Sequence, residues 1–152
     1  LLTNIKNLFS YDRANVAMST EEGDQLEILA LGTSNGLMEL PEERFLTPEL
    51  TGFEEHKRGV VIIIPDLQFV VEQNKHIQNL KNQGFRSLVS VPLMAENHYI
   101  GAFSIMAYEP NAFSNDKLEI IKESASQVAI AFWQSRLREE LNEQLELQSW
   151  QR

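Results

Sequence analysis

The sequence of 152 residues contains no cysteine. This absence excludes disulfide bonds, thiolate metal sites and every catalytic thiol. Basic residues are also few: 13 Lys and Arg stand against 22 Asp and Glu, and the formal net charge is -9. The basic residues are scattered along the chain, whereas nucleic-acid binders concentrate Lys and Arg on one surface. We therefore expect no nucleic acid among the partners of this chain.

Long apolar runs are missing as well. The run Val60–Ile64 has the length of a strand, and no run approaches the roughly 20 residues that cross a bilayer. The chain also opens without the basic and apolar regions of a signal peptide. We therefore predict a cytoplasmic location and no membrane insertion by this chain.

The elements that are present indicate one mixed domain. Apolar residues make up 43% and charged residues 23%, as in ordinary globular proteins. Alternating apolar residues predict strands, and apolar spacings of three and four predict helices. The expected strands cover 13–19, 25–31, 60–64, 85–94 and 99–108, and the expected helices cover 1–9, 48–57, 69–82 and 115 to near the C-terminus. Because no βαβ alternation runs through the chain, we predict an α+β fold in which helices cover an antiparallel sheet.

Three local patterns give more specific expectations. In the second strand Leu26, Ile28 and Ala30 alternate with other residues, which predicts that they share one buried face. The unbroken apolar run Val60–Ile64 predicts a strand that is covered on both faces. Gly101 stands inside the last strand and predicts a close backbone approach or a bulge.

The C-terminal helix changes character partway along. Ser114 is a suitable N-cap, and the first half carries an apolar stripe of Leu118, Ile121, Ala125, Val128 and Phe132. The stripe then ends, and a second set begins on a rotated face among charged residues: Leu137, Leu141 and Leu145. We predict a globular domain over residues 1–135 and a helical extension over 136–152. A lone helix of this length is marginal in water, so these three leucines are expected to form a homodimer interface.

Two neighbouring segments resemble the C-terminal hairpin of GAF domains. They are Gly84–Leu93, which ends Val-Pro-Leu, and Tyr99–Ile105, which contains Ile-Gly before an apolar strand. Ile64–Leu67, which reads Ile-Pro-Asp-Leu, and Ala112–Ser114 before a long helix also resemble this family, so the resemblance covers roughly residues 1–135. It implies a GAF/PAS-like fold with an antiparallel sheet of five to six strands and the terminal helices on one face. On the other face it implies a small-molecule pocket, roofed by residues 32–59 and 66–84.

The resemblance also indicates which side chains line that pocket. The ligand-binding candidates combine apolar side chains with a few polar groups that could orient a ligand: Ile64, Asp66, Phe69, His76, Phe85, Arg86, Ser87, Val89, Phe103 and Ser104. Strand alternation puts Ser87 and Val89 on one face of their strand, and Leu88 and Ser90 on the other. Only one of these two pairs can face the pocket.

Several activities of the family do not fit these residues. GAF-fold enzymes that reduce free methionine sulfoxide depend on cysteines, which are absent here. Cyclic-nucleotide-binding members carry an Asn-Lys pair at the end of the last strand, where this chain reads Met106-Ala107-Tyr108. Bilin-binding members attach their chromophore through a Cys-His pair, and Lys75-His76 stands at those positions. Covalent bilin attachment is therefore excluded, while noncovalent bilin binding stays open.

No pattern of catalytic or metal-binding residues stands out. The three histidines, His56, His76 and His98, are far apart in sequence and lack the paired spacing of metal ligands. His56 lies among charged residues and His98 in a hairpin turn, so both are expected to be exposed. We expect no catalytic residues and no metal, and the sequence leaves the cofactor unknown.

These observations favour a non-catalytic input domain that senses a small molecule or another signal. We expect it to belong to a multidomain signal-transduction protein, such as a histidine kinase of a two-component system or a diguanylate cyclase, and to relay its signal through the C-terminal helix. The expected partners are an unidentified small-molecule ligand, a covalently linked effector domain and a second copy of the chain. The alternative is a ligand-free homodimerisation module.

Overall fold

The computed structural model describes residues 11–20, 25–33, 35–37, 45–46, 53–71 and 75–150. The helix expected over residues 1–9 and the beginning of the helix expected over 48–57 lie outside these ranges. No helix within the described ranges combines the length and the apolar composition that a bilayer-spanning segment needs.

Within the described ranges, seven strands join in one antiparallel sheet. The strands are β1 (Arg13–Ser19), β2 (Leu26–Thr33), β3 (Gly36–Leu37), β4 (Phe45–Leu46), β5 (Ile62–Ile64), β6 (Ser87–Ala95) and β7 (His98–Ala107). Their order is β3-β2-β1-β7-β6-β5, and β4 also pairs with β2. The helical elements are α2 (Phe53–Lys57), the 3-10 turn η1 (Leu67–Phe69), α3 (Lys75–Asn82) and α4 (Asn115–Trp150). The predicted α+β class with an antiparallel sheet is confirmed; β3 and β4 are short additions of two residues each.

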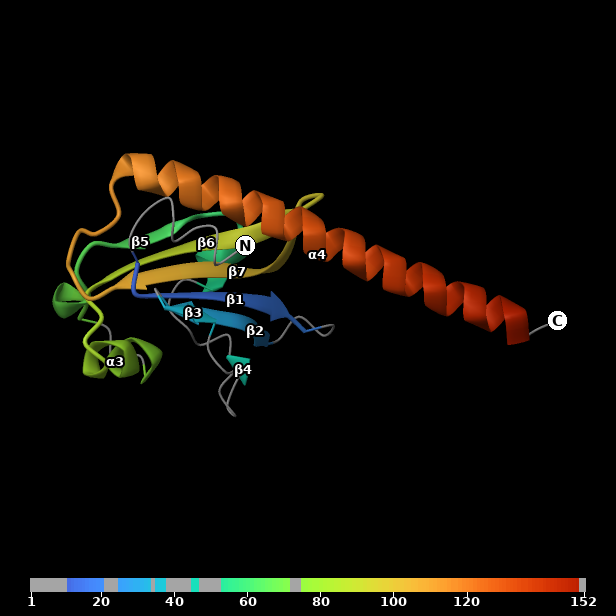
Figure 1. The fold of residues 1–152 in the computed structure, drawn as a ribbon, viewed down its shortest axis with the longest axis horizontal. Coiled ribbons are helices and arrows are strands. Elements are labelled where there is room, and N and C mark those ends of the chain that lie inside the picture. The colour runs from blue at the N-terminus through green and yellow to red at the C-terminus, as the bar shows by residue number, and fades with distance from the viewer. Residues whose placement is uncertain are drawn as a thin grey trace.

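The main core lies between the sheet and α4, which covers one face (Figure 1). Alternate residues of the three central strands point toward this helix, as the period of two in a strand requires. The buried members of this core are Tyr11, Ala14, Val16, Met18, Val89, Val91, Leu93, Ile100, Phe103, Ile105, Ile121, Ala125, Val128 and Ala129. The apolar stripe predicted for the first half of the C-terminal helix therefore packs on the sheet.

The opposite face of the sheet carries two separate apolar clusters. The α3 cluster consists of Leu67, Ile77, Leu80, Phe85, Leu88 and Met106. The β2 cluster consists of Ala17, Leu26 and Ile28. Figure 1 shows α3 on the side of the sheet away from α4. Because the two clusters do not merge, this face leaves space between them.

Gly101 lies where β7 passes close to β1. A Cβ atom built at this position would stand 2.1 Å from the backbone oxygen of Ala17, a distance that real Cβ atoms do not adopt. The close backbone approach predicted from the sequence is thus confirmed.

The prediction for the buried face of β2 is wrong in part. Val16 pairs with Ala30, whereas the next residue, Ala17, pairs with Ile28, so Leu29 is an extra residue without a counterpart on β1. A bulge of one residue reverses the alternation of the strand. Leu26 and Ile28 consequently belong to the β2 cluster, while Ala30 packs against the core under α4.

The prediction that Val60–Ile64 is covered on both faces is also wrong. β5 ends the sheet order and pairs with β6 alone. The side chains of Val60 and Ile63 are 46% and 49% exposed. β5 is an edge strand of three residues, so part of this apolar run stays open to solvent. An apolar run in the sequence looks the same in an edge strand and in a central strand.

The last third of α4 extends away from the sheet (Figure 1). The helix has 36 residues, which corresponds to about 54 Å at 1.5 Å per residue. Near the point where the helix leaves the domain, the guanidinium of Arg136 donates a hydrogen bond to the backbone oxygen of Ser19, at 2.6 Å. Beyond Arg136 every described residue of α4 is exposed.

Candidate ligand-binding site

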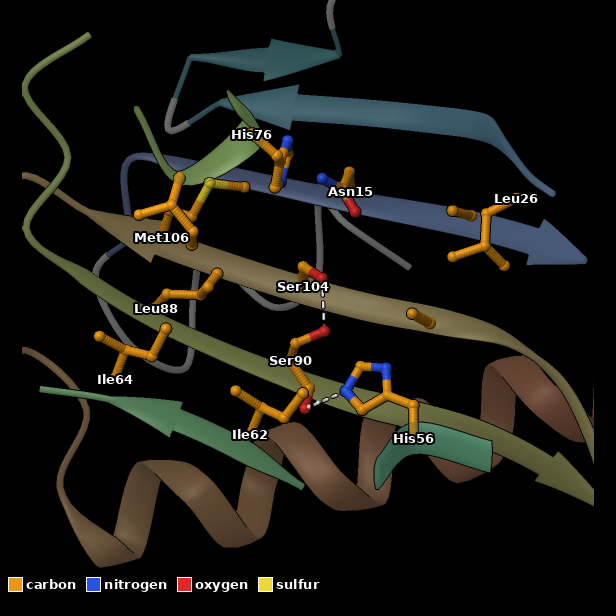
Figure 2. Close-up of a pocket in the computed structure, with 13 residues that line it drawn as sticks. Asn15, Leu26, His56, Ile62, Ile64, His76, Leu88, Ser90, Ser104 and Met106 are labelled. Atoms are coloured by element: carbon orange, nitrogen blue, oxygen red, sulfur yellow. Dashed lines mark hydrogen bonds between the residues drawn. The ribbon is translucent and has the colours of Figure 1, made fainter. Parts of the chain in front are cut away.

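A pocket lies between the α3 cluster and the β2 cluster, on the face of the sheet opposite α4 (Figure 2). The sheet forms its floor, and α2 and α3 supply side chains above the floor. Its described lining residues are Asn15, Ala17, Leu26, His56, Ile62, Ile64, His76, Ile77, Leu88, Ser90, Ala102, Ser104 and Met106. The cavity volume available to the centres of water molecules is about 70 Å³, several times the roughly 10–15 Å³ that one water needs.

A polar row crosses the floor of the pocket. It consists of Asn15 on β1, Ser104 on β7 and Ser90 on β6, which are direct cross-strand partners in the sheet register. The hydroxyl oxygens of Ser90 and Ser104 are 2.8 Å apart, so one hydroxyl donates to the other. Cross-strand partners on one face have neighbouring side chains, so the register itself gathers these three polar groups beneath one pocket.

His56 covers the polar row from above. α2 places this imidazole over β6, with Nε2 at 3.0 Å from the backbone oxygen of Ser90 (Figure 2). A carbonyl oxygen accepts hydrogen bonds, so Nε2 carries the hydrogen, and in the neutral ring Nδ1 is left as an acceptor. Burial lowers the pKa of His56, and it outweighs the opposing effects of the hydrogen bond to Ser90 and of the nearby Glu55 carboxylate.

The prediction that His56 is exposed is wrong: its side chain is 5% exposed. The charged neighbours Glu54, Glu55 and Lys57 are exposed, and the helical turn directs the imidazole to the opposite side. A helix of five residues presents different residues to solvent and to the sheet, which the local composition does not reveal.

His76 enters the pocket from α3 at the other end of the polar row (Figure 2). Burial lowers the pKa of its imidazole. α3 is held by Ile77 and Leu80, which are buried in the α3 cluster, and the preceding helical turn begins at an N-cap formed by Asp66. Ile77 and Leu80 stand three residues apart, the spacing of one helical face.

The walls of the pocket are apolar and unequal in size. Large aliphatic side chains stand on one side of the polar row: Ile62, Ile64, Ile77, Leu88 and Met106. On the other side the floor carries Ala17 and Ala102, with Leu26 beyond them. Two alanines in the floor leave room above the sheet that larger side chains would fill.

Of the ten predicted ligand-binding residues, the structure brings Ile64, His76 and Ser104 together in this pocket. Val89 and Phe103 are on the opposite face, in the core under α4, so the prediction for these two is wrong. Phe103 and Ser104 are consecutive in one strand, and alternation sends them to opposite faces. The same rule places Val89 away from the pocket once its neighbours Leu88 and Ser90 line it.

Three other candidates lie outside the described pocket lining. Phe69 is 80% exposed. Phe85 belongs to the α3 cluster and lies between the Tyr108 ring, at a centroid distance of 4.7 Å, and the Arg13 guanidinium, at 4.7 Å from its centroid. The hydroxyl of Ser87 donates to the backbone oxygen of Glu109 at 2.7 Å. Phe85 and Ser87 therefore hold segments around the pocket, and Phe69 faces solvent.

Asp66 and Arg86 form an ion pair with each other. Arg86 donates from Nε to Oδ1 of Asp66 at 3.1 Å and from one terminal nitrogen to Oδ2 at 2.5 Å. This hydrogen bonding to Arg86 lowers the pKa of Asp66. Asp66 also accepts from the backbone N–H of Gln68, so the pair fixes the start of η1. Neither residue is among the described lining residues.

Sequence reasoning missed Asn15, His56, Ser90 and Ala102 as lining residues. Once Ser104 is assigned to the pocket, alternation assigns Ala102 and Met106 to the same face of β7. The residue of β6 that pairs with Ser104, which is Ser90, must then face the pocket as well. That signal was present in the sequence. The position of Asn15 depends on which strand neighbours β7, which no local pattern gives.

No group of three or more histidine, aspartate or glutamate side chains that could hold a metal ion occurs among the described residues. Imidazole, hydroxyl and amide groups suit hydrogen bonding to an organic ligand.

Comparison with known families agrees with this geometry. The family model for the GAF domain matches residues 1–132 of the chain. The chain belongs to the GAF family. The predicted membership is thereby confirmed, and the GAF domain is a sensory module. A comparison with curated proteins by sequence gave no significant match.

Solved GAF structures share the fold of this GAF domain. GAF3 of Slr1393 from Synechocystis sp. PCC6803, solved in its photoproduct state, has a TM-score of 0.74 at 16% identity, covering 91% of this chain and 92% of that chain. A domain described as putative two-component sensor histidine kinase protein from Sinorhizobium meliloti 1021 has a TM-score of 0.68 at 17% identity, covering 91% and 90%. The cyanobacteriochrome TePixJ GAF domain has a TM-score of 0.71 at 15% identity, covering 88% and 85%.

Proposed function

We propose that this GAF domain is the non-catalytic, small-molecule-sensing input domain of a multidomain signal-transduction protein. The observation that carries the proposal is the pocket between the sheet and the helices α2 and α3, where His56, Ser90 and Ser104 gather within an otherwise apolar lining. Binding sites for small molecules combine apolar walls with a few placed polar groups. Of the ligand-binding candidates from the sequence, Ile64, His76 and Ser104 stay part of this proposed site.

The arrangement of the sheet supports a relay from the pocket to α4. β6 and β7 carry Leu88, Ser90 and Ser104 on the pocket face, and their intervening residues Val89 and Phe103 pack under α4. A ligand that prefers one arrangement of these strands also selects one position of the helix packed behind them. The signal then passes along α4 to a covalently linked effector.

The effector is proposed to be a histidine kinase of a two-component system, a diguanylate cyclase or a similar output domain in the cytoplasm. Support comes from the fold shared with the Sinorhizobium meliloti 1021 domain, which is described as part of a putative sensor histidine kinase. The domain is proposed to cover residues 1–135, with 136–152 as the helical extension. The exposed positions of Leu137, Leu141 and Leu145, at 48%, 55% and 53%, support a second role for this extension as the homodimer interface.

The second candidate is a ligand-free homodimerisation module. The same exposed leucines favour it, because they need a partner whether or not the pocket is occupied. Noncovalent tetrapyrrole binding is a further alternative, since the cyanobacteriochrome TePixJ GAF domain shares the fold and His76 lines the pocket.

Native mass spectrometry of the freshly purified chain, together with its absorbance spectrum, tests the proposal. We expect a retained small molecule in the wild-type chain and its loss in Ala102→Leu, because a leucine on the floor fills the pocket. Ala131→Leu adds the same volume at an exposed position of α4 and should retain the molecule. Visible absorbance together with a retained mass that matches a tetrapyrrole would assign the molecule to that class.

A chain that carries no small molecule, and that no member of a metabolite library stabilises against heat, would contradict sensing through this pocket. Dimerisation that persists in that case would favour the ligand-free module.

A further inference from the structure

We infer that the pocket takes a small, uncharged molecule with a planar polar edge that carries both a hydrogen-bond donor and an acceptor, as a carboxamide or a lactam does. This inference rests on the proposed sensing function and narrows the chemistry of the ligand. Three features of the pocket carry it: the lack of charge in the described lining, the hydrogen-bonding groups that the polar row offers, and the shape of the space above it.

The first feature concerns charge. None of the described lining residues is Asp, Glu, Lys or Arg. The ion pair of Asp66 and Arg86 is closed on itself and lies outside the described lining. The two imidazoles, His56 and His76, have pKa values lowered by burial, so both are neutral around neutral pH. Among the described lining residues, a charged ligand would meet no opposite charge to offset the hydration that it loses, which is costly.

The second feature is the set of hydrogen-bonding groups. In the pair Ser90 and Ser104, one hydroxyl hydrogen is used inside the pair and the other is left to donate outward. The Nδ1 atom of His56 is an acceptor, since Nε2 donates to the backbone oxygen of Ser90. Figure 2 shows this imidazole reaching over the sheet toward β7, so that the acceptor and the hydroxyl pair face one region of the pocket.

Asn15 completes the set at the other end of the polar row. Its amide offers both a donor and an acceptor, and its register position places it beside Ser104. A ligand with only acceptors would leave Nδ1 of His56 unsatisfied, and a ligand with only donors would leave the outward hydroxyl hydrogen unsatisfied. Unsatisfied buried polar groups are unfavourable, so the complementary ligand carries both functions.

The third feature is shape. Ala17 and Ala102 keep the floor low beside the polar row, while Leu88 and Met106 rise on its other side. A flat molecule can lie over the alanines, present its polar edge to the row and pack its apolar part against the aliphatic wall. The same wall gives a charged group nothing to interact with.

Three planar probes of nearly equal size separate the possibilities: benzamide, benzoate and benzamidinium are uncharged, anionic and cationic at about pH 7.5. Each is titrated into the ¹⁵N-labelled chain while backbone amide shifts are recorded. We expect benzamide to shift the amides of Asn15, Ser90 and Ser104 and to bind at least about tenfold more tightly than either charged probe.

Variants test the assigned groups. Ser104→Ala removes one hydroxyl of the pair and should weaken benzamide binding about tenfold, as the loss of one hydrogen bond predicts. Ser126→Ala removes a hydroxyl at an exposed position of α4 and should leave the affinity unchanged. The amide spectra also show whether each variant is folded.

Tighter binding of benzoate or benzamidinium in the pocket would overturn the inferred ligand class and leave the sensing proposal standing. Benzamide shifts confined to residues outside the pocket, or no shift with any probe up to its solubility, would overturn the inference as well. A molecule retained in native mass spectrometry would still support sensing in that case, so the two failures are distinguishable.

Discussion

At the scale of single residues, Gly101 allows a close backbone approach between β7 and β1 at the centre of the sheet. Hydrogen at this Cα allows β7 to lie against the backbone of Ala17, whose oxygen would stand 2.1 Å from an added Cβ. Ala17 and Ala102, which pair directly, form the low part of the pocket floor. The glycine therefore positions the floor as well as the sheet.

Gly101→Ala should lower the free energy of unfolding by about 3 kcal/mol, because the clash involves backbone atoms that cannot turn away. Urea denaturation measures this loss. Gly59→Ala is the control: an added Cβ there meets nothing within 4 Å, although φ is +82°, so a cost of about 1 kcal/mol is expected from the left-handed backbone alone. Equal losses in the two variants would contradict the close-approach explanation.

The two pocket histidines make stability depend on pH. Burial lowers the pKa values of His56 and His76 from 6.5 in the folded chain. As pH falls through about 6.5, the unfolded chain binds protons that the folded chain does not bind, so the free energy of unfolding decreases. Its limiting slope is about 1.4 kcal/mol per pH unit for each proton.

Urea denaturation at about pH 7.5, 6.5 and 5.5 tests this dependence, a window in which histidines dominate the titration. The double variant His56→Gln/His76→Gln should show a flatter dependence, and the amide that replaces the His56 imidazole keeps an N–H for the backbone oxygen of Ser90. A double variant with an unchanged slope would show that these two side chains do not cause it.

At the scale of elements, α4 is attached to the sheet by two contacts near the point where it leaves the domain. The ring of Trp133 stacks on His98, the first residue of β7, with a centroid distance of 5.7 Å. One turn further along, Arg136 donates to the backbone oxygen of Ser19 at the end of β1, at 2.6 Å. These two contacts hold the direction in which the extension leaves the domain. Both attachment points belong to strands whose other face lines the pocket.

Arg136→Ala should lower the free energy of unfolding by about 1 kcal/mol, since one hydrogen bond to a backbone oxygen is lost. Arg138→Ala, two residues further along on an exposed position, should change it by less than about 0.5 kcal/mol. Urea denaturation of the two variants side by side compares them under one condition. A loss as large in Arg138→Ala as in Arg136→Ala would argue against a specific tether.

At the scale of the whole molecule, the chain combines a compact domain with a helix that extends beyond it (Figure 1). The extension carries Leu137, Leu141 and Leu145 at spacings of four, and all three are about half exposed. Glutamates lie among them at positions 139, 140, 143 and 146, and the exposed side chains of Leu147 and Trp150 add apolar surface nearer the end of the helix. A second copy of the chain offers the same apolar stripe and can cover it.

Leu141→Glu should weaken dimerisation at least tenfold, because burying a leucine contributes roughly 1.5–3 kcal/mol and a buried glutamate opposes association. Sedimentation equilibrium over a range of concentrations measures the dissociation constant. Asn142→Glu adds the same charge to the neighbouring exposed position, away from the stripe, and should dimerise like the wild type. A wild-type chain that stays monomeric at high concentration would rule out this interface.

Much of the fold was predictable because its elements follow local periodicity. The residues of β1 alternate, α4 follows a spacing of three and four until Phe132, and Gly84 ends the segment after α3 with φ of +92°. The strand limits predicted for residues 13–19 coincide with β1. Such patterns depend on neighbours within one element, so a single sequence suffices to recognise them.

The sequence by itself determined the absence of thiol chemistry, the α+β class and the existence of a second apolar stripe on the last helix. The tertiary structure alone decided which strand faces form the pocket, because a bulge at Leu29 and the pairing of β1 with β7 are long-range features. It also buried His56 over Ser90. Local composition describes the neighbours of a residue along the chain, whereas a pocket is assembled from residues that only the sheet register brings side by side.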